Sequence, residues 1–422
     1  MTDNPLIFKC MNKLDTIAYL APEIPSISGT FVYKEILTLQ DKGIKVVPIS
    51  IHQVETIVEE QRIKELAKNT TYLYQQSLIT ALISSLAFFL KEPTNYLKTL
   101  WMVFKDIYSS KITKISSWKL LYQFVYASIA GEAIQKNGCQ YLHIHFAHVP
   151  TQIGMYASSL TNIPFSFTSH ANDIFENNFL LEQKMERAKA AVTISEYNYR
   201  FLSERGINTD KLEVVRCGID PDGRDFVPKS KIANLPVIGS LGRLIEKKGM
   251  DDTILALSKL HQQGIDFRLE IGGDGPLNDY LQEIAKKHDL IDKIEFKGSI
   301  PNDRVYDWLK NLDIFVLACK EDSKGDRDGI PVVLMEAMLA GVPVISTNIS
   351  GIPELIQDEQ SGFLAQPSDP ESLASTINKV LHWPDIARIT QVARNKVTGE
   401  FELKNNVDRL LSVFNGMVRD RF

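Results

Sequence analysis

Short apolar runs alternate with amphipathic windows through almost all of the 422 residues, and this alternation limits the possible folds more than any other feature. Strand-length runs separated by helical windows are typical of parallel strands joined by crossover helices. The runs lie at 14–21, 45–50, 141–147, 164–169, 190–195 and 211–216, and then at 236–243, 267–274, 293–298, 313–319 and 343–348. We therefore predict an α/β chain of two Rossmann-like domains that face each other across a cleft, with ligands at the carboxyl ends of the strands.

The segment 217–236 separates the two sets of runs. It is rich in glycine, proline and charge, and it shows neither the period of a strand nor that of a helix. Such segments join domains, so we predict a linker here, between an N-terminal domain over 1–216 and a C-terminal domain that begins at 237.

The composition is that of a water-soluble globular chain, with 44% hydrophobic and 23% charged residues. The net charge of -5 gives no general positive field, so we expect no nucleic-acid partner. The four cysteines, Cys10, Cys139, Cys217 and Cys319, are far apart and are interpreted as reduced thiols. The first residues contain no long apolar run, so we expect no signal peptide and a cytoplasmic location.

Residues 78–90 are mainly apolar but too few to span a bilayer, which favours a buried or interfacial helix. Residues 91–119 carry six lysines against Glu92 and Asp106. One helical face there collects Leu97, Leu100, Trp101, Phe104, Ile107 and Tyr108, with Lys91, Lys98 and Lys105 at its flanks. The pattern suits the surface of an anionic membrane, and a core-facing helix with solvated lysines accounts for it equally.

Glycines stand where strands end and helices begin. Ser28, Gly29 and Thr30 precede a helix whose free N–H groups could meet an anion, although a helix cap needs the same residues. Arg243 and Lys248 follow a strand in the second half. They could converge on one diphosphate, or they could be two solvated cations.

A further strand ends at Gly272, Gly273 and Gly275. This spacing is not the dinucleotide fingerprint, which argues against a dehydrogenase.

The loop 321–330 is acidic and turns at Pro331 into a short apolar helix that contains Glu336. A carboxylate among apolar neighbours needs a partner, and ligand hydroxyls or a buried salt bridge would serve. Asp328 stands at the mouth of this helix, where it could reach a sugar of the same ligand or cap the helix.

Histidines cluster at two strand ends. His170 follows the run 164–169 and is either a site residue or a satisfied core histidine. His143, His145 and His148 suggest a metal site, but no carboxylate lies at ligand spacing in the sequence. We therefore predict no metal.

These segments together resemble a known family. The motifs PEIPSISGTFVYKE, SHAND, SLGRLIEKKG, GGDGP, DGIPVVLMEAMLAGVPVIST and GIPELI follow one another in the order typical of family 4 retaining glycosyltransferases with the GT-B fold. The chain most resembles their bacterial exopolysaccharide, capsule and colanic-acid branch. The resemblance implies an acceptor-binding N-terminal domain over 1–216, a nucleotide-sugar-binding domain over 237–400, and a closing helix over 401–422 that packs back on the N-terminal domain.

The resemblance assigns roles to residues one at a time. Glu336 matches the second glutamate of the Glu-x7-Glu motif, which holds the nucleotide ribose, and Asp328 stands in place of the first. Arg243 and Lys248 match the basic pair on the donor diphosphate. The expected catalytic residues are His170, Asp328, Arg243 and Lys248, and the expected donor-binding residues are Gly29, Arg243, Lys248, Gly273, Ile300, Ile330, Val332 and Glu336.

The predicted activity is transfer of a sugar, with retained configuration, from a UDP- or GDP-linked donor to a hydroxyl group of a lipid-linked glycan, without metal or cofactor. An epimerase of the same fold and a non-catalytic nucleotide-sugar-binding protein are the alternatives. We expect a cytoplasmic chain that can dock peripherally on the inner face of the plasma membrane.

Overall fold

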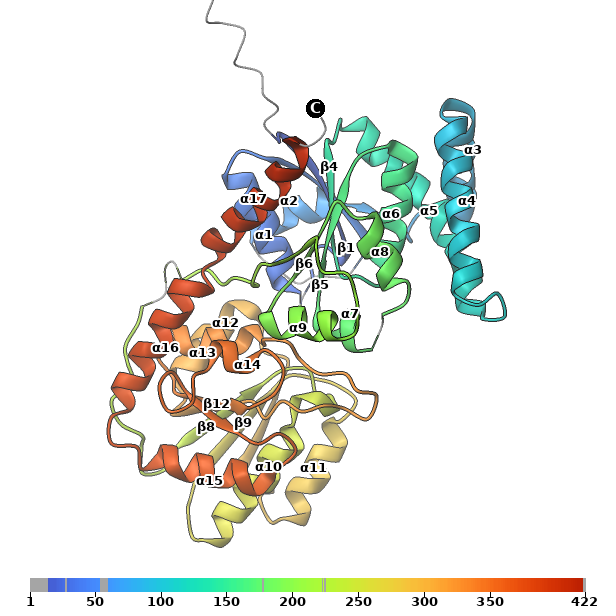
Figure 1. Cartoon of the computed structure of the whole chain (residues 1–422). Coiled ribbons are helices and arrows are strands. Elements are labelled where there is room, and N and C mark those ends of the chain that lie inside the picture. Colours follow the sequence, from blue (N-terminus) through green and yellow to red (C-terminus); the bar gives the residue numbers. More distant parts are fainter. Residues whose placement is uncertain are drawn as a thin grey trace, which may run out of the picture. The chain divides into compact units, whose positions relative to one another are not determined.

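The computed structural model describes residues 14–26, 29–53, 60–176, 178–221, 223 and 225–419 (Figure 1). The chain divides into two compact units. The first consists of Met1–Thr193, Phe201–Val215 and Asn406–Phe422, and the second of Ile194–Arg200 and Arg216–Asn405. Ser28 and parts of the predicted linker, residues 222 and 224, lie outside the described residues.

The first unit is built on a seven-stranded parallel sheet of order β3-β2-β1-β4-β5-β6-β7. Its strands are β1 Thr16–Glu23, β2 Lys45–His52, β3 Thr71–Tyr72, β4 Tyr141–His145, β5 Phe165–Ser169, β6 Ala190–Thr193 and β7 Leu212–Val214. The helices that accompany it are α1 Thr30–Asp41, α2 Gln61–Asn69, α3 Leu78–Lys91, α4 Pro93–Ser109, α5 Ile115–Lys136, α6 Val149–Thr161, α7 Ala171–Phe175 and α8 Leu181–Arg187. Helices α9 Glu196–Glu204 and α17 Leu403–Arg419 begin in residues of the second unit and end in residues of the first.

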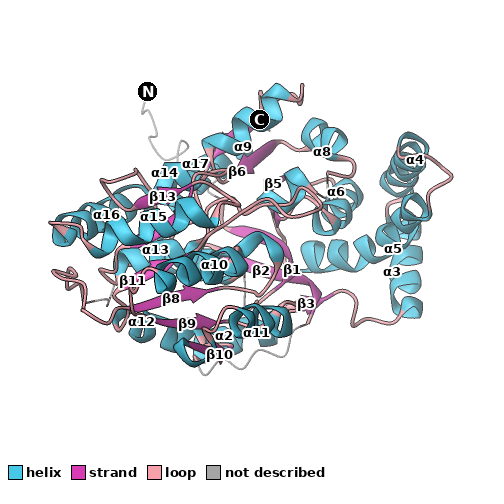
Figure 2. Cartoon of the chain, turned by 90° about the horizontal axis from the view of Figure 1, so that it is seen from below, coloured by secondary structure: helices cyan, strands magenta, loops and turns pink. Residues whose placement is uncertain are grey.

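The centre of this sheet is buried on both faces. Every residue of β4 and β5 is buried, as expected where helices cover a parallel sheet (Figure 2). Gly154 lets α6 lie close to the strands, because a Cβ at this position would come within 2.4 Å of Ile144 Cδ1. The tight packing fixes the ends of the central strands, where the histidines lie.

The second unit has a six-stranded parallel sheet of order β10-β9-β8-β11-β12-β13. Its strands are β8 Val237–Leu241, β9 Arg268–Gly272, β10 Ile294–Gly298, β11 Ile314–Val316, β12 Val344–Thr347 and β13 Phe363–Ala365. Its helices are α10 Met250–Gln262, α11 Asn278–Lys287, α12 Asn302–Lys310, α13 Val332–Leu339, α14 Ile352–Leu355, α15 Pro370–Leu381 and α16 Ile386–Glu400.

The predicted α/β class with two Rossmann-like sheets is confirmed. Each apolar run of the sequence corresponds to a strand at its expected place. Two strands were not predicted, β3 and β13, because runs of two and three residues carry no recognisable period.

Helix α3 has an inverted polarity for a helix at the surface of a water-soluble domain. Its buried residues are Ala81, Ser84, Ser85 and Phe88. Its exposed face consists of Leu78, Ile79, Leu82, Ile83, Leu86, Phe89 and Leu90. The small residues let α3 pack on α5, where a Cβ on Gly131 would lie 2.8 Å from Phe88 Cζ.

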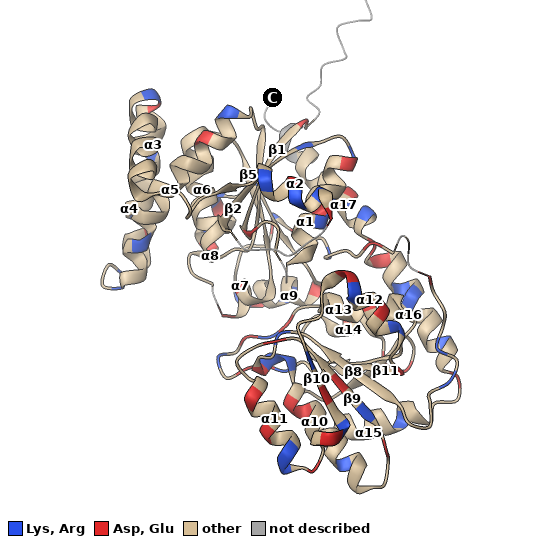
Figure 3. Cartoon of the chain, turned by 180° about the vertical axis from the view of Figure 1, so that it is seen from behind, with Lys and Arg blue, Asp and Glu red and all other residues tan. Residues whose placement is uncertain are grey.

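Helix α4 continues this apolar surface. Leu97, Trp101, Phe104 and Tyr108 are exposed, whereas Ile107 is buried and Leu100 is half-buried. The core-facing alternative therefore holds for Ile107 but not for the four exposed residues. We call the exposed apolar residues of α3 and α4 the α3–α4 surface, and in Figure 3 these two helices are mostly uncharged, with a few blue Lys segments. None of the described helices combines the length and apolarity that crossing a membrane requires.

A buried ion pair anchors α4 to the body of the first unit. Asp106 is buried, and its two carboxylate oxygens each accept a 2.6 Å hydrogen bond from Arg187. Tyr156 of α6 donates a further hydrogen bond of 2.9 Å to the same carboxylate. A bidentate pair of this kind fixes orientation as well as position, so α4 is held rigidly while its outer face stays exposed.

Candidate functional site

The loops after β8, β9 and β11 meet at the carboxyl edge of the second sheet. Gly273, with φ of 121°, allows this contact, because a Cβ there would lie 1.9 Å from the carbonyl oxygen of Gly242. Gly249, with φ of 63°, does the same beside Ala318, whose carbonyl oxygen would be 1.7 Å from an added Cβ. Glycine is therefore needed at both positions for the loops to close on one another.

This closure brings Lys248 and Asp328 together, two residues that the sequence analysis had assigned to one ligand. Lys248 Nζ lies 2.7 Å from Asp328 Oδ2, and both side chains are largely buried. Burial alone would raise the pKa of the Asp328 carboxyl group, but Lys248 and Lys247 outweigh it and hold the pKa below its usual value. Burial likewise opposes the charge of Lys248, and Asp328 raises its pKa in compensation. The pair is therefore ionised at neutral pH.

Lys247 and Asp326 extend the cluster. Lys247 Nζ lies 2.6 Å from Asp326 Oδ2 and 3.6 Å from Asp328 Oδ1. Arg243, at the start of the same loop, is exposed, and its guanidinium has no ion pair or hydrogen bond with any other described residue. The two lysines balance the two aspartates of this cluster, and the Arg243 guanidinium stands outside these pairs.

The remaining donor-site candidates lie around this cluster. Glu336 is buried in α13, which begins after Pro331. Ile330 is buried beside Gly351, and Val332 is half-buried at the start of α13. Ile300 follows β10 and packs over Gly272 at the end of β9. The side chains expected to contact the donor thus come from separate loops of one sheet edge.

Gly29 is the N-cap of α1 in the first unit. Its own N–H donates to Ser26 Oγ over 3.1 Å. The amides that remain for an anion are those of Thr30 and Phe31, which lack an acceptor within the helix. A Cβ on Gly29 would lie 3.3 Å from Ser26 Oγ, which makes the loop tight.

His170 lies at the end of β5 in a chain of hydrogen bonds. Its Nε2 is 3.2 Å from Nδ1 of His145, and Nε2 of His145 is 3.1 Å from Oε1 of Glu35. With Glu35 as the acceptor, His145 donates through Nε2 and accepts from His170 through Nδ1. Burial, with His145 and His148 beside it, holds the pKa of His170 well below its usual value, so the ring is neutral.

The possible metal site contains a carboxylate that sequence spacing did not reveal. Glu35, from α1, offers a ligand atom within 4.8 Å of those of His143 and His145. Nδ1 of His143, however, is 2.7 Å from Ser166 Oγ, and its Nε2 is 3.1 Å from Thr168 Oγ1. Both ring nitrogens that a metal would need are already hydrogen-bonded, so the absence of a metal remains our prediction.

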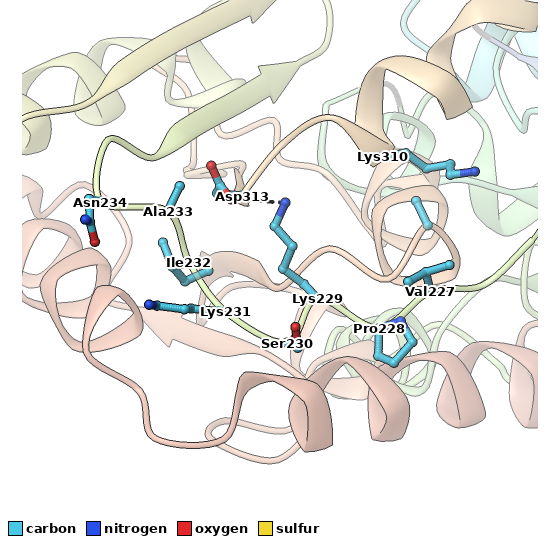
Figure 4. Close-up of a pocket in the computed structure, with 11 residues that line it drawn as sticks. Val227, Pro228, Lys229, Ser230, Lys231, Ile232, Ala233, Asn234, Lys310 and Asp313 are labelled. Carbon is cyan, nitrogen blue, oxygen red and sulfur yellow. Dashed lines mark ion pairs between the residues drawn. The ribbon is translucent and has the colours of Figure 1, made fainter.

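A pocket of about 530 Å³ in the second unit lies elsewhere (Figure 4). It is formed by the segment 227–234 together with Lys310, Asp313 and Ala340. Lys229 Nζ lies 3.0 Å from Asp313 Oδ1, just before β11 begins. This is the amino edge of the sheet, opposite to the edge where ligands of such sheets bind, so the pocket is not the donor site.

The two parallel sheets define the class of protein. The fold is that of GT-B glycosyltransferases, and two solved structures illustrate it. A glycosyltransferase from Rickettsia africae ESF-5 has a TM-score of 0.69 at 20% identity and covers 96% of this chain and 99% of its own. Anabaena HepE in complex with UDP and glucose has a TM-score of 0.68 at 15% identity and covers 95% of this chain and 100% of its own.

The sequence identifies the family. Residues 224–396 match the model for glycosyl transferases group 1, and residues 106–222 match that for glycosyltransferase family 4. The chain belongs to the family 4 glycosyltransferases.

Two of the curated relatives that it matches are polysaccharide enzymes by name. The colanic acid biosynthesis glycosyltransferase WcaL of Escherichia coli is 35% identical over 222 residues, 52% of this chain and 55% of the relative. The amylovoran biosynthesis glycosyltransferase AmsK of Erwinia amylovora is 34% identical over 239 residues, 55% of this chain and 59% of the relative. The chain thus spans a little over half the length of these relatives.

Two residues of the sites had no assigned role in the sequence analysis. Glu35 stands in the motif GTFVYKE, but its partner His145 lies 110 positions away. Lys247 adjoins Lys248, and only its contacts with Asp326 and Asp328 distinguish it from a solvated lysine.

Proposed function

We propose that the chain transfers a sugar from a UDP- or GDP-linked donor to a hydroxyl group of a glycan acceptor in the synthesis of a surface polysaccharide. The observation that carries the proposal is the ionised Lys248–Asp328 pair beside Arg243 at the carboxyl edge of the second sheet. Membership of family 4 and the names of the relatives WcaL and AmsK support it.

In this proposal the cationic side chains act on the leaving group. Negative charge grows on the bridging oxygen as the nucleotide diphosphate departs, while the sugar becomes oxocarbenium-like. Arg243 and Lys248 offset that charge without a metal, since an ammonium group has three donors and its contact with Asp328 uses only part of them. His170 and Asp328 orient the sugar, and Glu336 holds the nucleotide. Attack by the acceptor on the face that the diphosphate leaves retains the configuration.

A panel of UDP- and GDP-sugars tests this function. The cognate donor should raise the melting temperature, because it binds the folded state alone. Adding an acceptor glycan should then give product and free nucleotide diphosphate. Formation of an epimer from the donor alone would favour an epimerase, and binding without any turnover would favour a nucleotide-sugar sensor.

We also propose that the chain docks on an anionic membrane through the α3–α4 surface, where a lipid-linked acceptor is presented. Large apolar side chains such as Ile79 and Trp101 are 70% and 62% exposed. The lysines of residues 91–119 supply the complementary charge.

Vesicle sedimentation tests the docking. The wild type should pellet with vesicles that contain phosphatidylglycerol and should be released by salt, and Ile79→Glu combined with Trp101→Glu should abolish pelleting. Tyr280→Glu is the matched control, since Tyr280 is 49% exposed on α11 of the second unit. Equal pelleting of the double variant and the control would contradict the proposal.

A further inference from the structure

The first unit contains an apolar pocket of about 730 Å³, a size typical of small-ligand sites. It is lined by Pro22, Ile51, His52, Tyr74, Ile115, Trp118, Lys119, Tyr122, Gln123, His148, Val149 and Pro150. One wall is a face of α5, and the other walls are the carboxyl ends of β1 and β2 and the start of α6. The pocket therefore lies at the ligand-binding edge of the first sheet.

Aromatic rings form most of the apolar lining. The Tyr74 ring is 5.3 Å from His52 and 5.5 Å from Tyr122, centroid to centroid, and Trp118 adds a fourth ring. Burial raises the pKa of Tyr74 to about 12, so its hydroxyl group keeps its proton at neutral pH. Rings of this kind offer flat apolar faces with a few hydrogen-bonding edges.

One polar atom in this wall has no partner. Gln123 is 6% exposed, lines the pocket, and its Oε1 makes no hydrogen bond to any described residue. A buried amide oxygen left in this state destabilises the folded chain unless a ligand satisfies it. The ligand that fits the pocket therefore brings a hydrogen-bond donor to an otherwise apolar site.

His148 lines the pocket as a neutral ring. Its Nδ1 accepts the N–H of Val149 over 2.8 Å, which leaves the ring proton on Nε2, 3.9 Å from Asp173 Oδ1. Burial lowers the pKa of His148 to about 4, so the ring is neutral. The pocket thus presents the Gln123 acceptor among uncharged aromatic and imidazole rings.

We propose that this pocket binds a sugar ring of the acceptor, with a ring hydroxyl group donating to Gln123 Oε1. A pyranose has apolar C–H faces for the aromatic rings and hydroxyl groups that both donate and accept. A lipid chain fills the same volume but has no donor for Gln123. The assignment rests on the proposed function and specifies which part of the acceptor this chain recognises.

The position of the pocket supports an acceptor rather than an unrelated ligand. The Phe146 ring lies 5.6 Å from that of His148 and 4.4 Å from that of His170. One ring thus separates the pocket wall from the histidine expected beside the donor sugar. Trp118 and Tyr122, which are 49% and 42% exposed, also form the open rim of the pocket.

The direct test is binding of simple glycosides to the full chain. Saturation-transfer NMR with the methyl glycosides of glucose, galactose, mannose and fucose should detect at least one ligand. Gln123→Leu should weaken binding of this ligand about tenfold. A tenfold loss of affinity corresponds to one lost hydrogen bond near the upper end of the usual range of hydrogen-bond energies. The variant should melt no lower than the wild type, because leucine removes an unpaired buried oxygen at similar size.

Ser128→Ala is the matched control. Ser128 lies on the same helix, is fully buried, and its Oγ also lacks a partner among the described residues, but it does not line the pocket. This variant should bind the glycoside like the wild type. Absence of binding by all four glycosides, or equal affinity in Gln123→Leu and the wild type, would overturn the assignment.

Farnesyl phosphate tests the lipid alternative. If farnesyl phosphate competes for the pocket and Gln123→Leu leaves this competition unchanged, the pocket binds a lipid chain and the sugar assignment is overturned. The donor panel with the wild type reports separately on the proposed function. A chain that binds a nucleotide sugar but none of the four glycosides therefore contradicts the pocket assignment alone.

Discussion

Replacing Asp328 with asparagine keeps the size of the side chain and removes one charge from the cluster at the second sheet. Lys248 Nζ, 2.7 Å from the carboxylate, then keeps a largely buried charge without a counter-ion. Leaving one partner of a buried pair alone costs about 3–5 kcal/mol. Lys247 retains Asp326 at 2.6 Å, so the loss falls mainly on Lys248.

A bound diphosphate can replace the missing charge, and this gives the variant a distinctive signature. Asp328→Asn should melt lower than the wild type but gain more stability from UDP or GDP. Tenfold tighter nucleotide binding would add about 1.4 kcal/mol at saturating ligand. Turnover should fall at the same time, because the sugar loses the carboxylate that positions it.

Two further variants make the reasoning refutable. Lys248→Met combined with Asp328→Asn removes both charges and should recover much of the lost stability, a coupling that a double-mutant cycle measures. Asp326→Asn should retain more turnover than Asp328→Asn. If Asp328→Asn shows the melting temperature and nucleotide response of the wild type, or if Asp326→Asn alone is inactive, the assignment of Asp328 is wrong.

Three more predictions follow from the described contacts. Arg243→Ala and Lys248→Ala should each slow transfer on the order of 10²-fold at saturating donor, more than they weaken donor binding, and near-normal turnover in both would exclude them from the site. Asp106→Ala removes a buried carboxylate and leaves the half-buried Arg187 unpaired, so it should destabilise the first unit by about 1–3 kcal/mol in urea unfolding, with an unchanged midpoint as the contrary result. Because burial lowers the pKa of His148 to about 4, the unfolded ring takes up a proton before the folded one does. The contribution of His148 to stability should therefore be full above pH 6.5 and fall by up to roughly 3 kcal/mol as the pH drops toward 4, and His148→Asn should reduce the pH dependence of thermal melts by this part.

The central strands were predictable because they are buried on both faces. Strand β11, for example, is a continuous apolar run in the sequence, as expected for a strand that helices cover on both faces. Strands β3 and β13 are too short for any pattern, and only pairing with a neighbour makes them strands.

Contacts between loops could not be predicted in the same way. Lys248 and Asp328 were each assigned to a ligand, but their mutual ion pair depends on Gly249 lying against Ala318, a tertiary contact. The polarity of α3 shows a different limit. The pattern of apolar residues shows which of them share a helical face, and it does not show whether that face meets the core or the exterior.

The inverted polarity of α3 has a consequence for how the chain tolerates substitution. In a comprehensive mutational scan, outward positions such as Leu82 and Ile83 should accept many apolar residues of any shape, because no neighbour restricts their volume. Inward positions such as Ala81 and Ser84 should reject large residues of every polarity, since α5 lies directly against them. The small inward positions of this helix would then be restricted in size, as positions in a protein interior are. Its exposed positions would favour apolar side chains, which is also typical of an interior.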